Sequence, residues 1–117
     1  MAPAVPIERG SIWWVELSPA VGHEQAGKRP VMVISAPPMN RGRSGLVVVA
    51  VMTGQASKYP SHVLAPAAVT GAAHDGTVMC EHLHTLSVDR MDTRPVGQAN
   101  AAVMALVDAS IRRLLAL

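Results

Sequence analysis

The stretch Gly22-His-Glu-Gln-Ala-Gly-Lys-Arg-Pro-Val-Met-Val-Ile-Ser35 joins a polar segment to an apolar run and decides how the fold is interpreted. Its two glycines permit backbone angles that other residues resist, and Pro30 biases Arg29 toward an extended conformation. Residues 31–35 are rich in β-branched side chains, which favours a buried strand. We expect a loop that carries the Arg29 guanidinium to the start of this strand, where it suits a phosphate. The same local pattern is also typical of a basic residue at a strand entrance in a solvated loop.

Short apolar runs on both sides of this stretch predict a sheet of several short strands. Residues 66–75 are rich in Ala and Gly, and we expect them to cover one end of the sheet with a single helical turn. Residues 87–91 are expected to make a turn or a single helical turn. Residues 92–96 are expected to form a short edge strand, because Pro95 cannot donate to a ladder. The other strands are expected at residues 11–17, 31–35, 46–52, 61–64 and 76–86.

The last segment has helical periodicity. Asn100 is a suitable N-cap, and Arg112 and Arg113 lie near the expected C-terminus, where cations suit the helix dipole. Apolar residues recur at helical spacing between these ends, at Val103, Leu106, Val107, Ile111, Leu114 and Leu115. The elements together predict a mainly β fold with a C-terminal α-helix, built on a small, strongly bent antiparallel sheet. We expect a single domain over residues 1–117, in which residues 1–9 form a flexible tail.

The composition narrows the class of protein. Half of the 117 residues are apolar, which suffices for a core. There is no run of about 18 apolar residues to predict a membrane span, and the start lacks the pattern of a secretory signal. Cys80 is the single cysteine, so no intrachain disulfide is expected and a cytoplasmic location is favoured. The net charge of +2 and the pI near 9.2 permit a polyanionic partner.

Arg29 and Thr53 form the first candidate site. Arg29 precedes one expected strand and Thr53 follows the next, so antiparallel pairing of these strands would bring both residues to one rim of the sheet. A guanidinium and a hydroxyl aimed at one point can hold a phosphate and stabilise charge that develops on it. A threonine at the end of a strand is also ordinary in proteins that have no such site.

Two further clusters are candidates. Cys80, His82 and His84 alternate along one expected strand and would share a face, as metal ligands do, but no fourth ligand is evident and we expect no metal. Five cations fall in loops between the early strands. They would form a positive groove if they gathered on one rim, and they are solvated loop charges if they did not. These cations are Lys28, Arg29, Arg41, Arg43 and Lys58.

Several segments together resemble the MazF/PemK family of toxin endoribonucleases. The pattern Gly-x-Glu-Gln-x-Gly-x-Arg-Pro within the stretch quoted above is specific, and the likeness covers residues 9–117. The other matching segments are Arg9-Gly-Ser-Ile-Trp-Trp-Val-Glu-Leu-Ser-Pro19, Leu46-Val-Val-Val-Ala-Val-Met-Thr53, Tyr59-Pro60, Glu81-His-Leu-His-Thr-Leu86 and the terminal amphipathic helix.

This resemblance implies a small barrel of the SH3-like or CcdB-like type, assembled as a homodimer. It implies an mRNA interferase of a type II toxin–antitoxin module, which cleaves single-stranded RNA at specific sequences without a metal or other cofactor. The products implied are 2′,3′-cyclic phosphate and 5′-hydroxyl ends. A cognate acidic, MazE-like antitoxin is expected to occupy the RNA groove.

The family's catalytic arginine and threonine fall on Arg29 and Thr53. Its loop Glu and Gln match Glu24 and Gln25, and Gln55 matches a polar position after the threonine. His23 stands where relatives usually have serine and is a candidate for proton transfer. RNA-binding or supporting roles are expected for these loop and polar residues and for Lys28, Arg41, Arg43, Lys58, Glu81, His82 and His84. His82 and His84 replace Gln-like and basic positions, so we expect an altered base preference.

Two other functions stay open on the sequence. A CcdB-like toxin shares this barrel but poisons DNA gyrase by protein contact, without nuclease activity. Such a protein needs neither Arg29 nor Thr53, so their joint presence favours the nuclease. An inactive relative would keep only the binding of an antitoxin.

Overall fold

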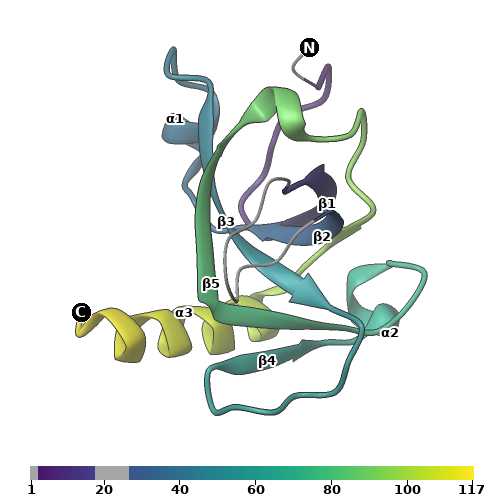
Figure 1. Ribbon diagram of the computed structural model, residues 1–117, viewed down its shortest axis with the longest axis vertical. Helices are drawn as coiled ribbons and strands as arrows, with labels where there is room; N and C mark the ends of the chain where they lie inside the picture. Colours follow the sequence, from purple (N-terminus) through teal and green to yellow (C-terminus); the bar gives the residue numbers. More distant parts are fainter. Residues whose placement is uncertain (1–2, 18–26) are drawn as a thin grey trace.

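The computed structural model describes residues 3–17 and 27–117, which form one curled sheet with a long helix packed against it (Figure 1). The strands are β1 (Ser11–Glu16), β2 (Lys28–Val33), β3 (Leu46–Thr53), β4 (His62–Ala65), β5 (Gly76–Ser87) and β6 (Gly97–Gln98). The helical segments are α1 (Pro37–Asn40), α2 (Ala67–Thr70), the 3₁₀ turn η1 (Val88–Arg90) and α3 (Ala101–Leu115). The mainly β fold with a C-terminal helix is thus confirmed, as are the helical turns expected within residues 66–75 and 87–91. None of the helices in the described ranges is long and apolar enough to cross a membrane.

The strands pair antiparallel throughout, in the order β4-β5-β3-β2-β1-β6. Because successive side chains of a strand point to opposite faces, each strand can supply two cores. One face carries the tryptophan core, which consists of Ile7, Trp13, Val15, Leu17, Val31, Val33, Val47, Val49, Val51, Met79, Leu86, Val88 and Met91. The other face carries the helix core, which consists of Ile12, Met32, Ala50, Met52, Val63, Ala65, Val78, Cys80, Ala99, Val103, Val107 and Ile111. Strands β2 and β3 contribute side chains to both cores. Both of their faces are therefore packed, and this packing fixes the position of their ends.

Strand β5 bends where its pairing with β3 changes register. Ala50 pairs with Leu83, but the next residue of β3, Val51, pairs with Met79. Residues 80–82 therefore have no partner on β3, and the long β5 turns sharply near its middle (Figure 1). Such bulges increase the bend of a strand and re-aim its side chains. The first half of β5 pairs with β4 on one side and with the end of β3 on the other, and the second half pairs with the rest of β3.

Helix α3 begins as the sequence predicts. The Asn100 side chain accepts a hydrogen bond from the Val103 amide at 2.9 Å, which satisfies one of the amides at the helix start. Val103, Val107 and Ile111 are buried against the sheet. The other apolar residues of the predicted stripe, Leu106, Leu114 and Leu115, are exposed, so the buried face of α3 is narrower than its periodicity indicates.

Two expected boundaries are wrong. Strand β2 begins at Lys28 rather than at residue 31, so Lys28 and Arg29 are strand residues paired with Glu16 and Val15 of β1. The edge strand expected at residues 92–96 is absent, and the pairing with β1 comes from β6 instead. Asp92 and Val96 donate single backbone hydrogen bonds to β1, at Trp14 and Ile12, and Pro95 between them has no N–H with which to continue a ladder.

The expected flexible tail is also wrong for its last residues. Ile7 is buried in the tryptophan core. Arg9 donates to the Ile34 carbonyl at 2.7 Å and pairs with Asp108 of α3. Residues 7–9 are therefore part of the packed domain.

Candidate active site at the ends of β2 and β3

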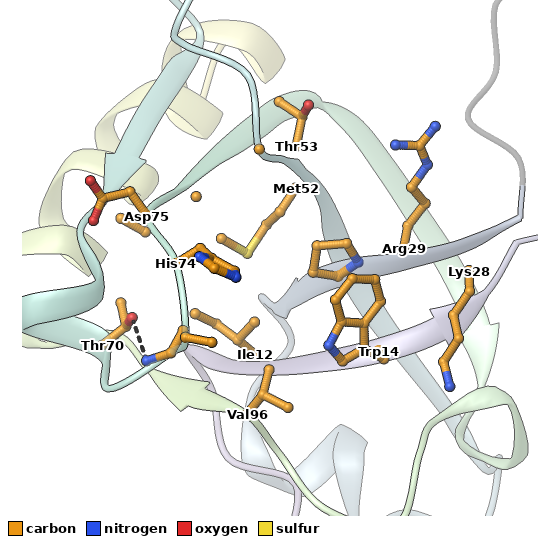
Figure 2. Close-up of a pocket in the computed structure, with 16 residues that line it drawn as sticks. Ile12, Trp14, Lys28, Arg29, Met52, Thr53, Thr70, His74, Asp75 and Val96 are labelled. Carbon is orange, nitrogen blue, oxygen red and sulfur yellow. Dashed lines mark hydrogen bonds between the residues drawn. The ribbon is translucent and has the colours of Figure 1, made fainter.

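Arg29 and Thr53 lie at the same end of two neighbouring strands. Strands β2 and β3 pair antiparallel through Val31 and Val51, and the two candidates lie two residues beyond that pair. Alternate residues of a strand point to the same face, and Val31 and Val51 belong to the tryptophan core. Arg29 and Thr53, each two residues away, therefore lie on the face that carries this core. Figure 2 shows their side chains extending toward the same side of the strands. The structure thus brings together the two residues that the sequence singled out.

A polar hollow of about 270 Å³ opens beside this pair. It unites the end of β3, the loop of residues 54–61 between β3 and β4, and the first half of β5. Six of the predicted site residues line it. The lining residues are Arg29, Thr53, Gln55, Ala56, Lys58, Tyr59, His62, Met79, Glu81 and His82.

A second, apolar hollow of about 360 Å³ lies on the other side of Arg29 and Thr53 (Figure 2). Arg29 and Thr53 line both hollows and so form the wall between them. Lys28 lines the apolar hollow but not the polar one, and its amine lies 3.1 Å from the Asp92 carboxylate. The walls of the apolar hollow include Ile12, Trp14, Pro30, Met52, Ala65, Ala72 and Val96.

Hydrogen bonds fix the start of the 54–61 loop next to Thr53. The Gln55 amide donates to the Thr53 hydroxyl oxygen at 3.2 Å, and the Thr77 hydroxyl donates to the Gln55 carbonyl at 2.8 Å. Because the Thr53 oxygen accepts this amide, the hydroxyl hydrogen can still be donated to a ligand. The arrangement holds a neutral donor beside the Arg29 cation.

Glu81, which also lines the polar hollow, is the centre of a second set of contacts. Its Oε1 accepts from the Ser61 hydroxyl at 2.7 Å, and its Oε2 lies 2.7 Å from His62 Nε2 and 3.9 Å from His82 Nε2. Burial raises the pKa of the Glu81 carboxyl, but hydrogen bonds from Ser61, its own backbone amide and His62 outweigh burial and lower that pKa below the usual glutamate value. The carboxylate is therefore held charged in contact with its donors.

The remaining predicted residues are not brought to this place. Arg41 and Arg43 are exposed in the connection between α1 and β3, so the basic residues gather only in part. His84 pairs with Val49, in the half of β5 beyond the bulge. His23, Glu24 and Gln25 lie outside the described residues. His62, by contrast, is a site residue that the sequence reasoning missed, although it follows the quoted Tyr59-Pro60 by two positions.

The bulge also separates Cys80 from His84, two of the three residues considered as metal ligands. Cys80 is fully buried in the helix core, whereas His84 pairs with Val49 of the tryptophan core on the other face. Burial raises the pKa of the Cys80 thiol, despite a hydrogen bond with Ser110. Within residues 3–17 and 27–117, no group of three or more His, Cys, Asp or Glu side chains is placed to hold a metal ion.

Comparison with known proteins decides the family. Residues 8–115 match the model of the PemK-like, MazF-like toxin of type II toxin–antitoxin systems. The chain belongs to this toxin family. It is 34% identical to endoribonuclease MazF9 of Mycobacterium tuberculosis over 91% of this chain and 93% of the relative. It is 33% identical to endoribonuclease EndoA of Bacillus subtilis over 95% of this chain and 96% of the relative.

Solved structures of MazF proteins have the same fold. The crystal structure of MazF from Deinococcus radiodurans superposes with a TM-score of 0.81 at 31% identity, covering 94% of this chain and 96% of that one. A MazE–MazF structure from the same organism gives a TM-score of 0.77 at 30% identity, covering 97% and 98%. The curled sheet with its C-terminal helix is therefore the fold of the MazF/PemK family.

The contacts of Glu81 predict an acid-dependent contribution to stability. A carboxyl whose pKa is lowered on folding stabilises the protein above its unfolded pKa of about 4.3, and this stabilisation is lost as the pH falls through the folded pKa. Glu81→Gln should lower the free energy of unfolding by about 1.5 kcal/mol at pH 7, because bonds to a charged acceptor are lost. The difference from wild type should shrink below pH 4. Urea unfolding of wild type and Glu81→Gln at pH 7 and at about pH 3 measures this difference in the free energy of unfolding. A difference that stays constant with pH would contradict the stabilising role of the charged Glu81 carboxylate.

Proposed function

We propose that this chain is the toxin of a type II toxin–antitoxin module and an endoribonuclease that cuts single-stranded RNA in the cytoplasm. The observation that carries the proposal is the joint position of Arg29 and Thr53 at the rim of a polar hollow. Membership of the MazF/PemK family and the endoribonuclease names of its relatives support the same activity. A toxin that acts only by protein contact has no need of this pair.

The proposed reaction is attack of a ribose 2′-hydroxyl on the adjacent phosphorus. The O2′–P bond forms and the P–O5′ bond breaks, while the 2′-oxygen loses a proton to a base and the 5′-oxygen gains one. Negative charge develops on the non-bridging oxygens, where Arg29 can donate two parallel hydrogen bonds and Thr53 a third. A guanidinium carries only hydrogen-bond donors and is a poor proton acceptor, so Arg29 acts as the clamp and not as the base. A guanidinium supplies the charge stabilisation that a metal supplies in other nucleases, and we propose a metal-independent reaction.

We further propose that Gln55, Lys58 and His82 contact the RNA from the walls of the polar hollow. Lys58 supplies a cation for the backbone, and Gln55 and His82 supply polar groups for base edges. His23, Glu24 and Gln25 belong to the same proposal through the family pattern.

Removal of the Arg29 guanidinium should abolish cleavage. Arg29 is only half-buried at the strand end, so Arg29→Ala should leave the fold intact. Arg29→Lys should be severely impaired because an ammonium cannot make the planar bidentate contact, and Thr53→Val should lose about 10²-fold in rate because the cation remains. Cleavage of a mixed-sequence RNA, with analysis of the ends, measures these effects.

The wild-type products should carry a cyclic phosphate and a free 5′-hydroxyl, and a chelator should not change the rate. A 5′-phosphate product, a requirement for added divalent metal or full activity in Arg29→Ala would show that the chemistry is wrong. Binding to an antitoxin without any RNA cleavage would identify an inactive relative. Inhibition of gyrase without RNA cleavage would identify a CcdB-like toxin.

A homodimer with an RNA groove at the subunit boundary is part of the proposal. Large apolar side chains are exposed on the chain, including Leu64, Leu106, Leu114 and Leu115, and such side chains are typical of an interface when they are contiguous. Sedimentation at micromolar concentration should give twice the chain mass. A species of 12.3 kDa alone would contradict the dimer.

The proposed inhibitor is an acidic, MazE-like antitoxin whose disordered tail lies in the same groove as RNA. Lys58 and Arg29 at the polar hollow provide cations for such a tail, and a disordered segment can wrap this surface as it folds. A labelled non-cleavable RNA should be displaced by the tail of the cognate antitoxin, and both affinities should fall as salt rises. Simultaneous binding of RNA and tail without competition would refute the shared groove.

A further inference from the structure

The loop of residues 54–61 forms one wall of the polar hollow, and it ends at a buried histidine. We propose that His62 and Glu81 are positioning residues that hold Lys58 and Tyr59 of this loop in place for RNA. The inference rests on the proposed endoribonuclease function, because it concerns how the substrate is held beside Arg29 and Thr53.

Both ring nitrogens of His62 are engaged. The Lys58 amide donates to His62 Nδ1 at 3.3 Å, and because an amide only donates, Nδ1 must be the unprotonated nitrogen of the ring. The hydrogen of neutral His62 then lies on Nε2, which donates to Glu81 Oε2 at 2.7 Å. The His62 side chain is only 4% exposed. Both nitrogens are thus committed to the protein, which makes His62 a support for the loop rather than a group that transfers a proton.

Glu81 extends this support to two further elements. Its other oxygen accepts from the Ser61 hydroxyl at 2.7 Å, and the Ser61 carbonyl accepts from the Ser110 hydroxyl of α3 at 2.9 Å. The end of the loop is therefore tied to β5 and to α3. The start of the loop is tied to β3 and β5 through the bonds of Gln55 described above.

Lys58 and Tyr59 lie between these two fixed ends. The Tyr59 ring meets the His62 ring edge-on, with centroids 5.2 Å apart and planes at 90°, while 59% of Tyr59 remains exposed. A cation and an exposed ring side by side on one wall suit the backbone and a base of single-stranded RNA. His62 therefore acts on RNA through the residues that it holds, and its loss should weaken binding rather than slow the chemical step.

Two substitutions separate the hydrogen bonds from the volume of the ring. His62→Leu fills much of the space but offers neither donor nor acceptor, and His62→Gln keeps one of each. His62→Leu should raise the KM for a cleavable RNA about 10-fold, as expected for two lost hydrogen bonds of ordinary strength, while kcat stays within about twofold. His62→Gln should recover most of the lost affinity. Ser61→Ala, which removes one bond to Glu81, should raise KM about threefold with kcat unchanged, and it serves as the test if His62→Leu does not fold.

Amide hydrogen exchange tests the anchor without RNA. The Lys58 amide should exchange faster in His62→Leu than in wild type and should be restored in His62→Gln. Unchanged exchange at Lys58, or equal KM values for the Leu and Gln variants, would overturn the anchor even if RNA is cleaved. A fall in kcat with KM unchanged would overturn the positioning role. If exchange at Lys58 responds as expected but the wild-type protein cleaves no RNA, the proposed function fails while the anchoring of the loop by His62 and Glu81 stands.

Discussion

The break in register between β3 and β5 is the constraint on which the site depends. If the ladder continued past Ala50 without interruption, residues 80–82 would be paired with β3 and aimed by its regular alternation. The bulge frees them from that pairing, bends β5, and turns Glu81 toward Ser61 and His62. The same bend lets β4 pair with the first half of β5 and so places the 54–61 loop beside Thr53. This one irregularity therefore shapes the parts of the polar hollow that the 54–61 loop and Glu81 provide.

Electrostatics explains how a carboxylate is accommodated in a hollow that is proposed to take a polyanion. An unpaired Glu81 would repel a phosphate backbone, and its burial would favour the protonated form. Ser61 and His62 instead donate one hydrogen bond to each oxygen of the Glu81 carboxylate, and these bonds stabilise its negative charge. Arg29 and Lys58 line the same hollow and are the cations proposed to face the RNA. Glu81 thus supports the structure of the hollow, while Arg29 and Lys58 are the residues proposed to contact the RNA.

Much of this arrangement could be predicted because it follows from local rules. The strands, the Asn100 cap and the approach of Arg29 to Thr53 follow from apolar runs and antiparallel pairing, and the family pattern names the same pair. The expectation that Cys80, His82 and His84 share one face fails for Cys80 and His84, because strict alternation does not hold across a bulge that no residue pattern marks. The start of β2 was misplaced because the pairing of Lys28 and Arg29 with β1 depends on a distant strand, not on their own polarity. His62 was missed because its importance arises from Glu81, 19 residues away in sequence, and nothing local signals that contact.

The adjacent tryptophans have a consequence for spectroscopy. Trp13 is fully buried in the tryptophan core, while Trp14, on the opposite face, is 38% exposed and lines the apolar hollow next to Arg29 and Thr53. The chain has no phenylalanine and a single tyrosine, so these two indoles dominate its ultraviolet emission. One indole is a reporter of the interior and the other a reporter of the surface beside the proposed catalytic pair. The native chain therefore carries two intrinsic fluorescent probes. A quencher dissolved in water reaches the exposed Trp14 but not the buried Trp13, so the emission of the two residues can be separated.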